Sequence, residues 1–175
     1  MEIIDLYDNE RKLTGEKIVR GSEIPSDRYR IVVHIVVISD DDKMLIQKRI
    51  DSKKKWPGKW DVSVGGAVQS GESSNIASER ELFEELGLKY DFSKARPTIS
   101  VAFDRGFDDY FVIKYSETSG EIKLQDTEVS DFKWASENEI LDMIDSGDFI
   151  PYRKQLINLF FSLYNSNGGF VVDKY

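Results

Sequence analysis

Residues 66–88 read GAVQSGESSNIASERELFEELGL, and this stretch decides the fold. We expect a helix over about 73–86, because a glycine, which commonly ends helices, follows it. At ~100° per residue, Glu81, Glu84 and Glu85 share one arc of this helix. The apolar residues lie on a different arc, which we expect to pack on a sheet: Ile76, Leu82, Phe83 and Leu86.

The clustered carboxylates admit two interpretations. Like charges three and four residues apart destabilise a helix by ~0.2–0.5 kcal/mol per pair, and a hard divalent cation would turn that repulsion into attraction. Mg²⁺ prefers oxygen ligands and bridges carboxylates to phosphates. Solvated acidic helix faces are also common, so the helix alone does not decide between a metal site and a solvated surface.

The spacing of the whole stretch is more specific. Gly66 is followed after five residues by Glu72, and after seven more by RELFEELGL at 80–88. This pattern resembles the Nudix box at all its specified positions. The resemblance implies an α/β fold (α+β), the Nudix α/β/α sandwich around a mixed sheet, with the box as a loop–helix–loop. It also implies hydrolysis of a diphosphate linkage, by water and with Mg²⁺ or Mn²⁺, in a nucleoside diphosphate derivative or similar small diphosphate.

The resemblance also implies roles for residues of the box. Glu84 and Glu85 would be the main metal ligands, and the backbone carbonyl of Gly65 would join them. Glu81 would be a further ligand or the base that activates water.

Two charged residues have alternative roles. Arg80 would orient Glu81 or pair with Glu72, and a purely structural ion pair is the other interpretation. Glu128 precedes an expected strand over 129–135, where Nudix pyrophosphohydrolases often supply an extra glutamate. It would be a ligand or the base, and an ordinary turn glutamate is the alternative.

Basic residues near a Pro-Gly loop at 53–59 (KKKWPGK) are candidates for binding substrate phosphates: Lys48, Arg49, Lys55 and Lys59. Solvated surface lysines are the common alternative. Trp56 and Trp60 are candidates for stacking on a base, with packing over the sheet edge as the other interpretation.

Residues 54–66 (KKWPGKWDVSVGG) also resemble isopentenyl-diphosphate isomerase and its hydrolase relatives. That isomerase has a cysteine and a histidine around the box glycine, where this chain has Gly65 and Ala67. Its other metal histidines fall on Glu23 and Arg30. The chain has no cysteine, so we expect isomerase activity to be lost.

The remaining elements are read from local patterns. A hairpin is expected within 1–28, and His34 is expected in the core of an apolar strand. Ser136 and Glu139 form a capping-box pattern that opens the C-terminal helices, expected over 136–165 with Pro151 in the first turn of the last one. The tail at 165–175 is expected to be loose. Strands are expected at 29–38, 44–49, 60–64, 98–103, 110–115 and 129–135.

Length and composition set the remaining limits. The 175 residues, 40% of them hydrophobic, suit a single domain over 1–175. A net charge of −8 disfavours a nucleic-acid polymer as partner, whereas a small anion remains suitable if a cation reverses the local charge. No apolar run approaches the ~18 residues of a membrane span, and no signal peptide is evident, so a cytoplasmic location is expected. The oligomeric state is open, with a homodimer among the alternatives.

A second function class competes with the hydrolase. Some Nudix domains bind a nucleotide without cleaving it and regulate a partner. Such sensors usually lose box glutamates or carry a DNA-binding domain, and this chain keeps every box residue, so the sequence favours the enzyme.

Overall fold

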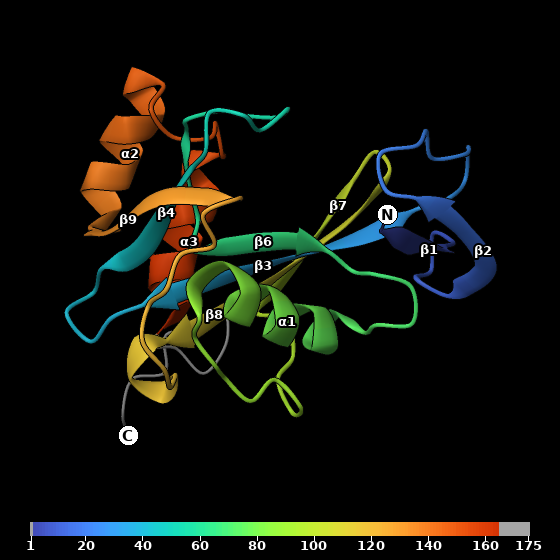
Figure 1. The fold of residues 1–175 in the computed structure, drawn as a ribbon, viewed down its shortest axis with the longest axis horizontal. Helices are drawn as coiled ribbons and strands as arrows, with labels where there is room; N and C mark the ends of the chain where they lie inside the picture. Colours follow the sequence, from blue (N-terminus) through green and yellow to red (C-terminus); the bar gives the residue numbers. More distant parts are fainter. Residues whose placement is uncertain (1, 165–175) are drawn as a thin grey trace.

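The computed structural model describes residues 2–164, which form a mixed seven-stranded sheet flanked by helices, with a separate two-stranded hairpin (Figure 1). The hairpin consists of β1 (Ile3–Tyr7) and β2 (Leu13–Val19). The sheet contains β3 (Arg30–Ile38), β4 (Met44–Arg49), β5 (Trp60–Asp61), β6 (Val64–Ala67), β7 (Ile99–Phe103), β8 (Gly106–Lys114) and β9 (Val129–Ala135). The helices are α1 (Ser74–Leu86), α2 (Glu137–Ser146) and α3 (Lys154–Tyr164), with a 3-10 turn at Tyr115–Glu117.

The central strand β3 determines the shape of the sheet. It pairs in parallel with β8 along its whole length. On its other edge, Val32–Ile35 pair with β6, and Ile38 pairs with Met44 of β4. The expected strand over 60–64 is therefore two strands, β5 on β4 and β6 on β3. The sheet divides at this point, directly before the box helix.

Two apolar cores lie on opposite faces of the sheet. One packs α1 on the sheet and contains Val33, Ile35 and Leu82. The other packs α2 and α3 on the opposite face and contains Ile140 and Phe160. The expected α/β/α sandwich around a mixed sheet is confirmed.

The buried face of α1 differs from the expected one. Leu82 and Leu86 are fully buried, but Ile76 and Phe83 are 54% and 53% exposed. The assignment of these two side chains to the core face was therefore wrong. The sheet-facing side instead includes Glu81, one of the carboxylates that the helical wheel placed on a separate polar arc.

The C-terminal helices begin and end near the expected residues. The capping box of α2 is formed by Ser136 and Glu139 as expected. The last helix starts at Lys154, so Pro151 lies before it and not in its first turn. The expectations for 165–175 lie outside the described residues. None of the helices within 2–164 is both long enough and apolar enough to cross a membrane.

The expected N-terminal hairpin is anchored by a buried ion pair. Arg11, in the turn between β1 and β2, donates two hydrogen bonds to Asp109 of β8: Nη1 to Oδ1 at 2.9 Å and Nη2 to Oδ2 at 2.6 Å. The Asp109 side chain is 1% exposed and also accepts hydrogen bonds from Ser74 and Ser100. Burial alone would raise the pKa of Asp109, but Arg11 and the two hydroxyl groups bring it below its usual value. The hairpin is thus tied to the sheet beside the start of α1.

Candidate active site

The box helix is fixed at both ends by local caps. The Ser73 side chain accepts a hydrogen bond from the Ile76 amide, and Gly87 adopts the left-handed conformation with φ 70°. Its last turn contains no basic residue, although Glu84 and Glu85 lie there. Negative charge near a helix C-terminus opposes the helix dipole, so these glutamates weaken the helix where they stand.

Glu81 is held against the box glycine. A Cβ atom added to Gly66 would lie 1.9 Å from Glu81 Oε1, so only glycine leaves room for this carboxylate. Burial raises the pKa of Glu81, and its ion pair with Arg80, Nη1–Oε1 at 2.7 Å, opposes that rise. A carboxylate is therefore kept at the sheet edge despite a desolvation cost.

Glu85 is the most deeply buried carboxylate of the box. It is 6% exposed, and burial raises its pKa to about 8. Gln47 Nε2 of β4 donates a 2.7 Å hydrogen bond to Glu85 Oε2, which opposes this rise, while the charge of Glu81 adds to it. Within the described residues, Gln47 Oε1 is buried without a hydrogen-bond partner. The pocket around Glu85 thus contains acceptors in excess of donors, which suits a bound cation.

Arg80 contacts both Glu81 and Glu72, the two partners expected for it from the sequence. Its guanidinium makes two bonds to Glu72, Nε–Oε1 at 2.7 Å and Nη2–Oε2 at 2.8 Å, and one to Glu81. It also reaches the Ala67 carbonyl at 3.1 Å and the exposed Glu84 at 3.2 Å. One arginine therefore joins the loop before the helix to two glutamates of the helix.

Glu128 lies in an ion pair with Lys53, which is not among the basic residues expected at the site. Burial lowers the pKa of Lys53, and so does the charge of Arg49, while Glu85 and Glu81 act in the opposite direction. These carboxylates therefore lie within electrostatic range of Lys53. The run of three lysines at 53–55 was the available signal, but a lysine run does not show which member turns inward.

The donor chemistry of the box fits a hard divalent cation, since Glu81, Glu84, Glu85 and the carbonyl of Gly65 all offer oxygen. Across residues 2–164, no three acidic or histidine side chains already form a converged metal cage. Glu84 is 47% exposed and lies 3.2 Å from Arg80, so it would have to turn away from this partner to join the two buried carboxylates. A fitting ion would thus bind with a change of side-chain conformation.

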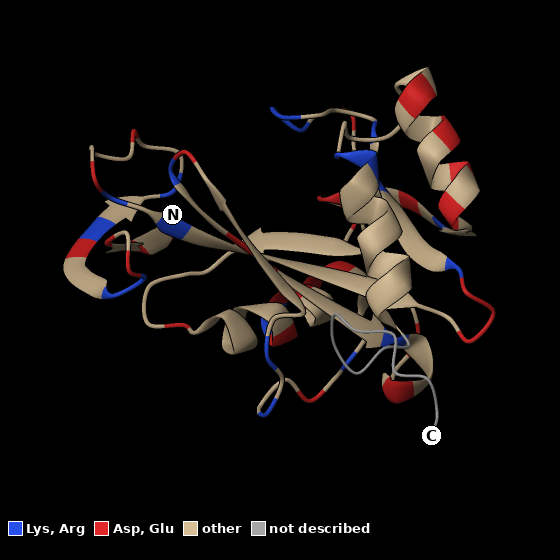
Figure 2. Cartoon of the chain, turned by 180° about the vertical axis from the view of Figure 1, so that it is seen from behind, with Lys and Arg blue, Asp and Glu red and all other residues tan. Residues whose placement is uncertain are grey.

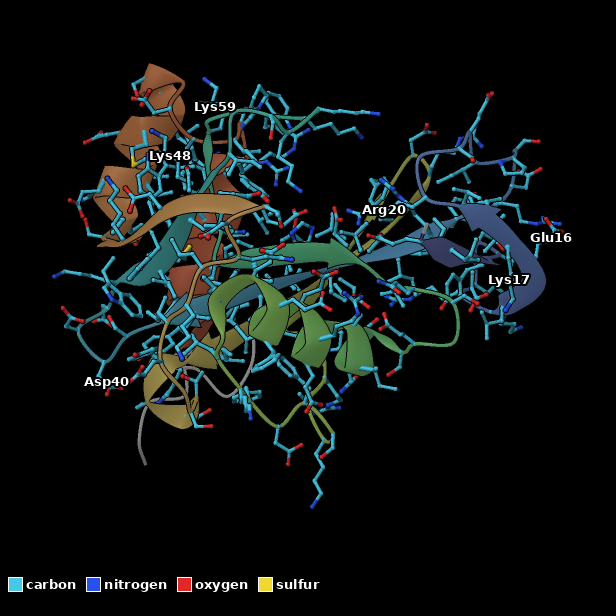
Figure 3. All side chains as sticks on the ribbon, viewed as in Figure 1. Glu16, Lys17, Arg20, Asp40, Lys48 and Lys59 are labelled. Carbon is cyan, nitrogen blue, oxygen red and sulfur yellow. The ribbon has the colours of Figure 1, made fainter. Side chains whose placement is uncertain are left out.

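A cavity of about 470 Å³ lies beside the box loop. Gly65, Gly66 and Ala67 form part of its wall. Of the four candidate phosphate-binding residues, Arg49 and Lys55 line it, whereas Lys48 and Lys59 do not. Lys59 Nζ donates to the Gly147 carbonyl at the end of α2. Lys48 and Lys59 lie on the α2 side of the molecule (Figure 3).

The aromatic candidates occupy different places. Trp56 lines the cavity, is 46% exposed and has φ 53°, an uncommon value for tryptophan. Trp60 packs on the core beneath α2 and α3, with Lys133 4.9 Å from its ring centre.

His34 does not lie in the core. It lines the cavity and stacks on Tyr110, with 4.5 Å between the ring centres, and its Nε2 lies 3.1 Å from Asp108 Oδ1. The expectation for His34 was wrong because its strand borders the cavity on that face.

Comparison with known proteins agrees with this geometry. A family model described as the NUDIX domain matches residues 28–155. An uncharacterised Nudix hydrolase of Listeria monocytogenes is 38% identical over 161 residues, covering 91% of this chain and 95% of the relative. The crystal structure of DR0079 from Deinococcus radiodurans has a TM-score of 0.72 and 26% identity, covering 94% of this chain and 100% of that chain.

A more distant structure shares the fold. It is a bifunctional NMN adenylyltransferase/ADP ribose pyrophosphatase from Francisella tularensis, with a TM-score of 0.59 and 21% identity. The match covers 78% of this chain and 42% of that chain. Since the family model spans most of the chain and the box is complete, this protein belongs to the Nudix family of hydrolases.

Proposed function

We propose that this Nudix hydrolase cleaves a diphosphate linkage in a nucleoside diphosphate derivative, or in a similar small diphosphate, with Mg²⁺ or Mn²⁺ as cofactor. The observation that carries the proposal is the burial of Glu81 and Glu85, one turn apart on α1, with Glu81 packed against Gly66 of the cavity wall. Their mutual repulsion in a poorly solvated site favours a divalent cation. The Francisella tularensis structure, described as complexed with AMP and Mn ion, supports the choice of metal.

Each box residue has a role in this proposal. Glu84 and Glu85 hold the cation together with Glu81 and the carbonyl of Gly65. Arg80 orients Glu81 through their 2.7 Å contact. The cation, when bound, neutralises phosphate oxygens and lowers the pKa of a water molecule.

The attacking water needs a proton acceptor, and two carboxylates are candidates. Glu81 lies against the box loop, and Glu128 pairs with Lys53, whose pKa responds to the charges of Glu85 and Glu81. Arg49 and Lys55, which line the cavity, contact the phosphates. Attack of this water at phosphorus breaks the bond to the bridging oxygen. Because water is the nucleophile, the chain needs no covalent nucleophile of its own.

The test is a screen with Mg²⁺ that separates and identifies the cleavage products by chromatography for six substrate classes: nucleotide sugars, nucleoside diphosphates, nucleoside triphosphates, ADP-ribose, dinucleotide polyphosphates and prenyl diphosphates. On any substrate found, Glu85→Gln should lower kcat by roughly 10²–10⁴-fold, because one charge leaves the proposed metal shell. Glu79 is exposed on the same helix and supplies the control. Glu79→Gln should change kcat by less than about threefold. Equal, mild losses in both variants would contradict the proposal.

The screen also separates the alternatives. Binding of a nucleotide without turnover of any substrate would favour a sensor. Formation of dimethylallyl diphosphate from isopentenyl diphosphate would indicate the isomerase, against the argument from Gly65 and Ala67.

A further inference from the structure

Two arginines line the cavity and are not used by the box. Arg30 is the first residue of β3, and Arg20 directly follows β2. Arg20 lies on the hairpin side of the molecule (Figure 3), opposite the candidate lysines Lys48 and Lys59. Four cationic side chains therefore line the cavity, since Arg49 and Lys55 line it as well.

In the part of the chain that the structure describes, Arg30 has no anionic partner. Its Nε atom is buried and makes no hydrogen bond, and no carboxylate within residues 2–164 forms an ion pair with it. Its guanidinium carbon lies 5.9 Å from the Phe103 ring centre. The ring packs against the guanidinium but cannot replace a carboxylate, and an unpaired, partly buried charge is costly.

The surroundings of Arg30 increase that cost. Burial lowers the pKa of Arg30, and the positive charge of Arg20 lowers it further. Asp108 acts in the opposite direction, but its Oδ1 lies 3.1 Å from His34 Nε2. The positive charges of Arg20 and Arg30 therefore face one cavity, and the negative charge near them is too small to neutralise both.

Arg20 is able to release its present partner, Glu2, and bind an anion in its place. Its Nη1 atom lies 2.5 Å from Glu2 Oε2, and the two side chains are 45% and 41% exposed. Exposed pairs of this kind contribute little to stability, so an anion in the cavity competes for Arg20 at small cost.

The cavity connects the two arginines to the box. Gly65 and Gly66 line the same space, and Gly66 is the residue against which Glu81 packs. Figure 2 shows acidic residues recurring along α2, whereas the loop over 53–59 beside the cavity is mainly basic. An anion is therefore attracted to this side of a chain whose net charge is −8.

We propose that Arg20 and Arg30 form a phosphate-binding subsite that holds a phosphate group of the diphosphate substrate in the cavity that Gly65 and Gly66 of the box loop also line. This inference rests on the proposed function. The planar guanidinium group binds phosphate oxygens through paired hydrogen bonds, which lysine does not provide. Arg20 lies outside residues 28–155, so the hairpin segment contributes to the active site beyond the part matched by the family model.

The experiment measures binding apart from turnover. Titration calorimetry in EDTA, and again with Mg²⁺, uses inorganic pyrophosphate and an α,β-methylene nucleoside diphosphate as probes. We expect Arg30→Gln to weaken binding at least about tenfold and Arg20→Gln about fivefold, as expected for charge-assisted hydrogen bonds. Arg28→Gln is the matched control, because Arg28 lies in the same segment, bonds to Glu16 and does not line the cavity. It should change affinity less than about twofold.

Three further measurements make the outcome decisive. Arg30→Gln should unfold at a temperature no lower than wild type, since it removes an unpaired cation. Arg30→Lys should bind as weakly as Arg30→Gln if paired hydrogen bonds matter. On any hydrolysed substrate, Arg30→Gln should raise KM far more than it lowers kcat.

The two proposals fail in different ways. Wild type that binds the probes through Arg30 but hydrolyses nothing would contradict the proposed function and leave the subsite standing. If wild type hydrolyses a substrate, and Arg30→Gln has the same KM and the same affinity for the probes as wild type, the proposed subsite is overturned. Malonate bound as tightly as pyrophosphate, with the same loss in Arg30→Gln, would overturn its assignment to phosphate.

Discussion

Glu85→Gln should stabilise the metal-free protein at alkaline pH while it removes activity. The carboxyl group has an ordinary pKa of 4.5, and burial raises it to about 8 in the folded protein. A raised pKa means that the folded state binds the proton more tightly than the unfolded state. Stability from this group is therefore complete below pH 4.5 and is lost as pH rises toward 8.

The magnitude follows from the size of the pKa shift. At 1.36 kcal/mol per pKa unit, titration of Glu85 costs the folded state roughly 3–4 kcal/mol between pH 5 and pH 8. Glutamine does not titrate, and its side-chain oxygen can still accept the hydrogen bond from Gln47. The variant should therefore avoid most of this loss.

The assay is urea unfolding in EDTA at pH 5 and pH 8 for wild type, Glu85→Gln and the exposed control Glu79→Gln. At each pH, the free energy of unfolding of wild type is subtracted from that of the variant. The relevant quantity is the change in this difference from pH 5 to pH 8, because the contributions of the other titrating groups cancel in it. Saturating Mg²⁺ at about 100 times its Kd should add about 2.7 kcal/mol to wild type and much less to Glu85→Gln. A pH-independent difference would refute the reasoning about Glu85, and an equal Mg²⁺ effect would refute its place in the metal site.

Two other changes test the site and its support. Gly66→Ala should preserve the fold but displace Glu81, because the new Cβ would lie 1.9 Å from Oε1; kcat should fall at least about tenfold, with unchanged circular dichroism. Normal kcat in that variant would show that the position of Glu81 is unimportant. Arg11→Met leaves Asp109 buried without its cation, so urea unfolding should show a loss of about 3 kcal/mol. A loss below about 1 kcal/mol would show that Ser74 and Ser100 satisfy the carboxylate alone.

Local signals predicted some element boundaries well and others poorly, since the strand expected over 110–115 is Gly106–Lys114 and the one expected over 60–64 is two strands. The helix expected over 73–86 is Ser74–Leu86 with Ser73 as its cap, and the strand expected over 129–135 has those limits. Caps, turn glycines and β-branched runs act over a few residues, so one sequence contains them fully. The box spacing likewise led to the family, because it includes residue types that the helix alone does not require.

Contacts between distant segments could not be read in this way. The helical wheel gives the angles between side chains of α1 but not which arc meets the sheet, so Phe83 was assigned to the core and Glu81 to a polar face. Burial of Glu85 depends on Gln47, 38 residues earlier. The position of Arg30 in the sequence shows only that it replaces a histidine of the isomerase, because nothing local shows that a cation will lack a partner.

The buried Asp109 carboxylate also has a consequence for the order in which the chain folds. Its hydrogen-bonding partners are 9, 35 and 98 residues away: Ser100, Ser74 and Arg11. Closing a longer loop costs more entropy, so the contact with Ser100 should form first and the one with Arg11 last. During synthesis, the hairpin that contains Arg11 leaves the ribosome early but must wait for β8 before it can dock. Arg20, next to that hairpin, therefore reaches the cavity only in the final stage of folding, when most of the sheet already exists.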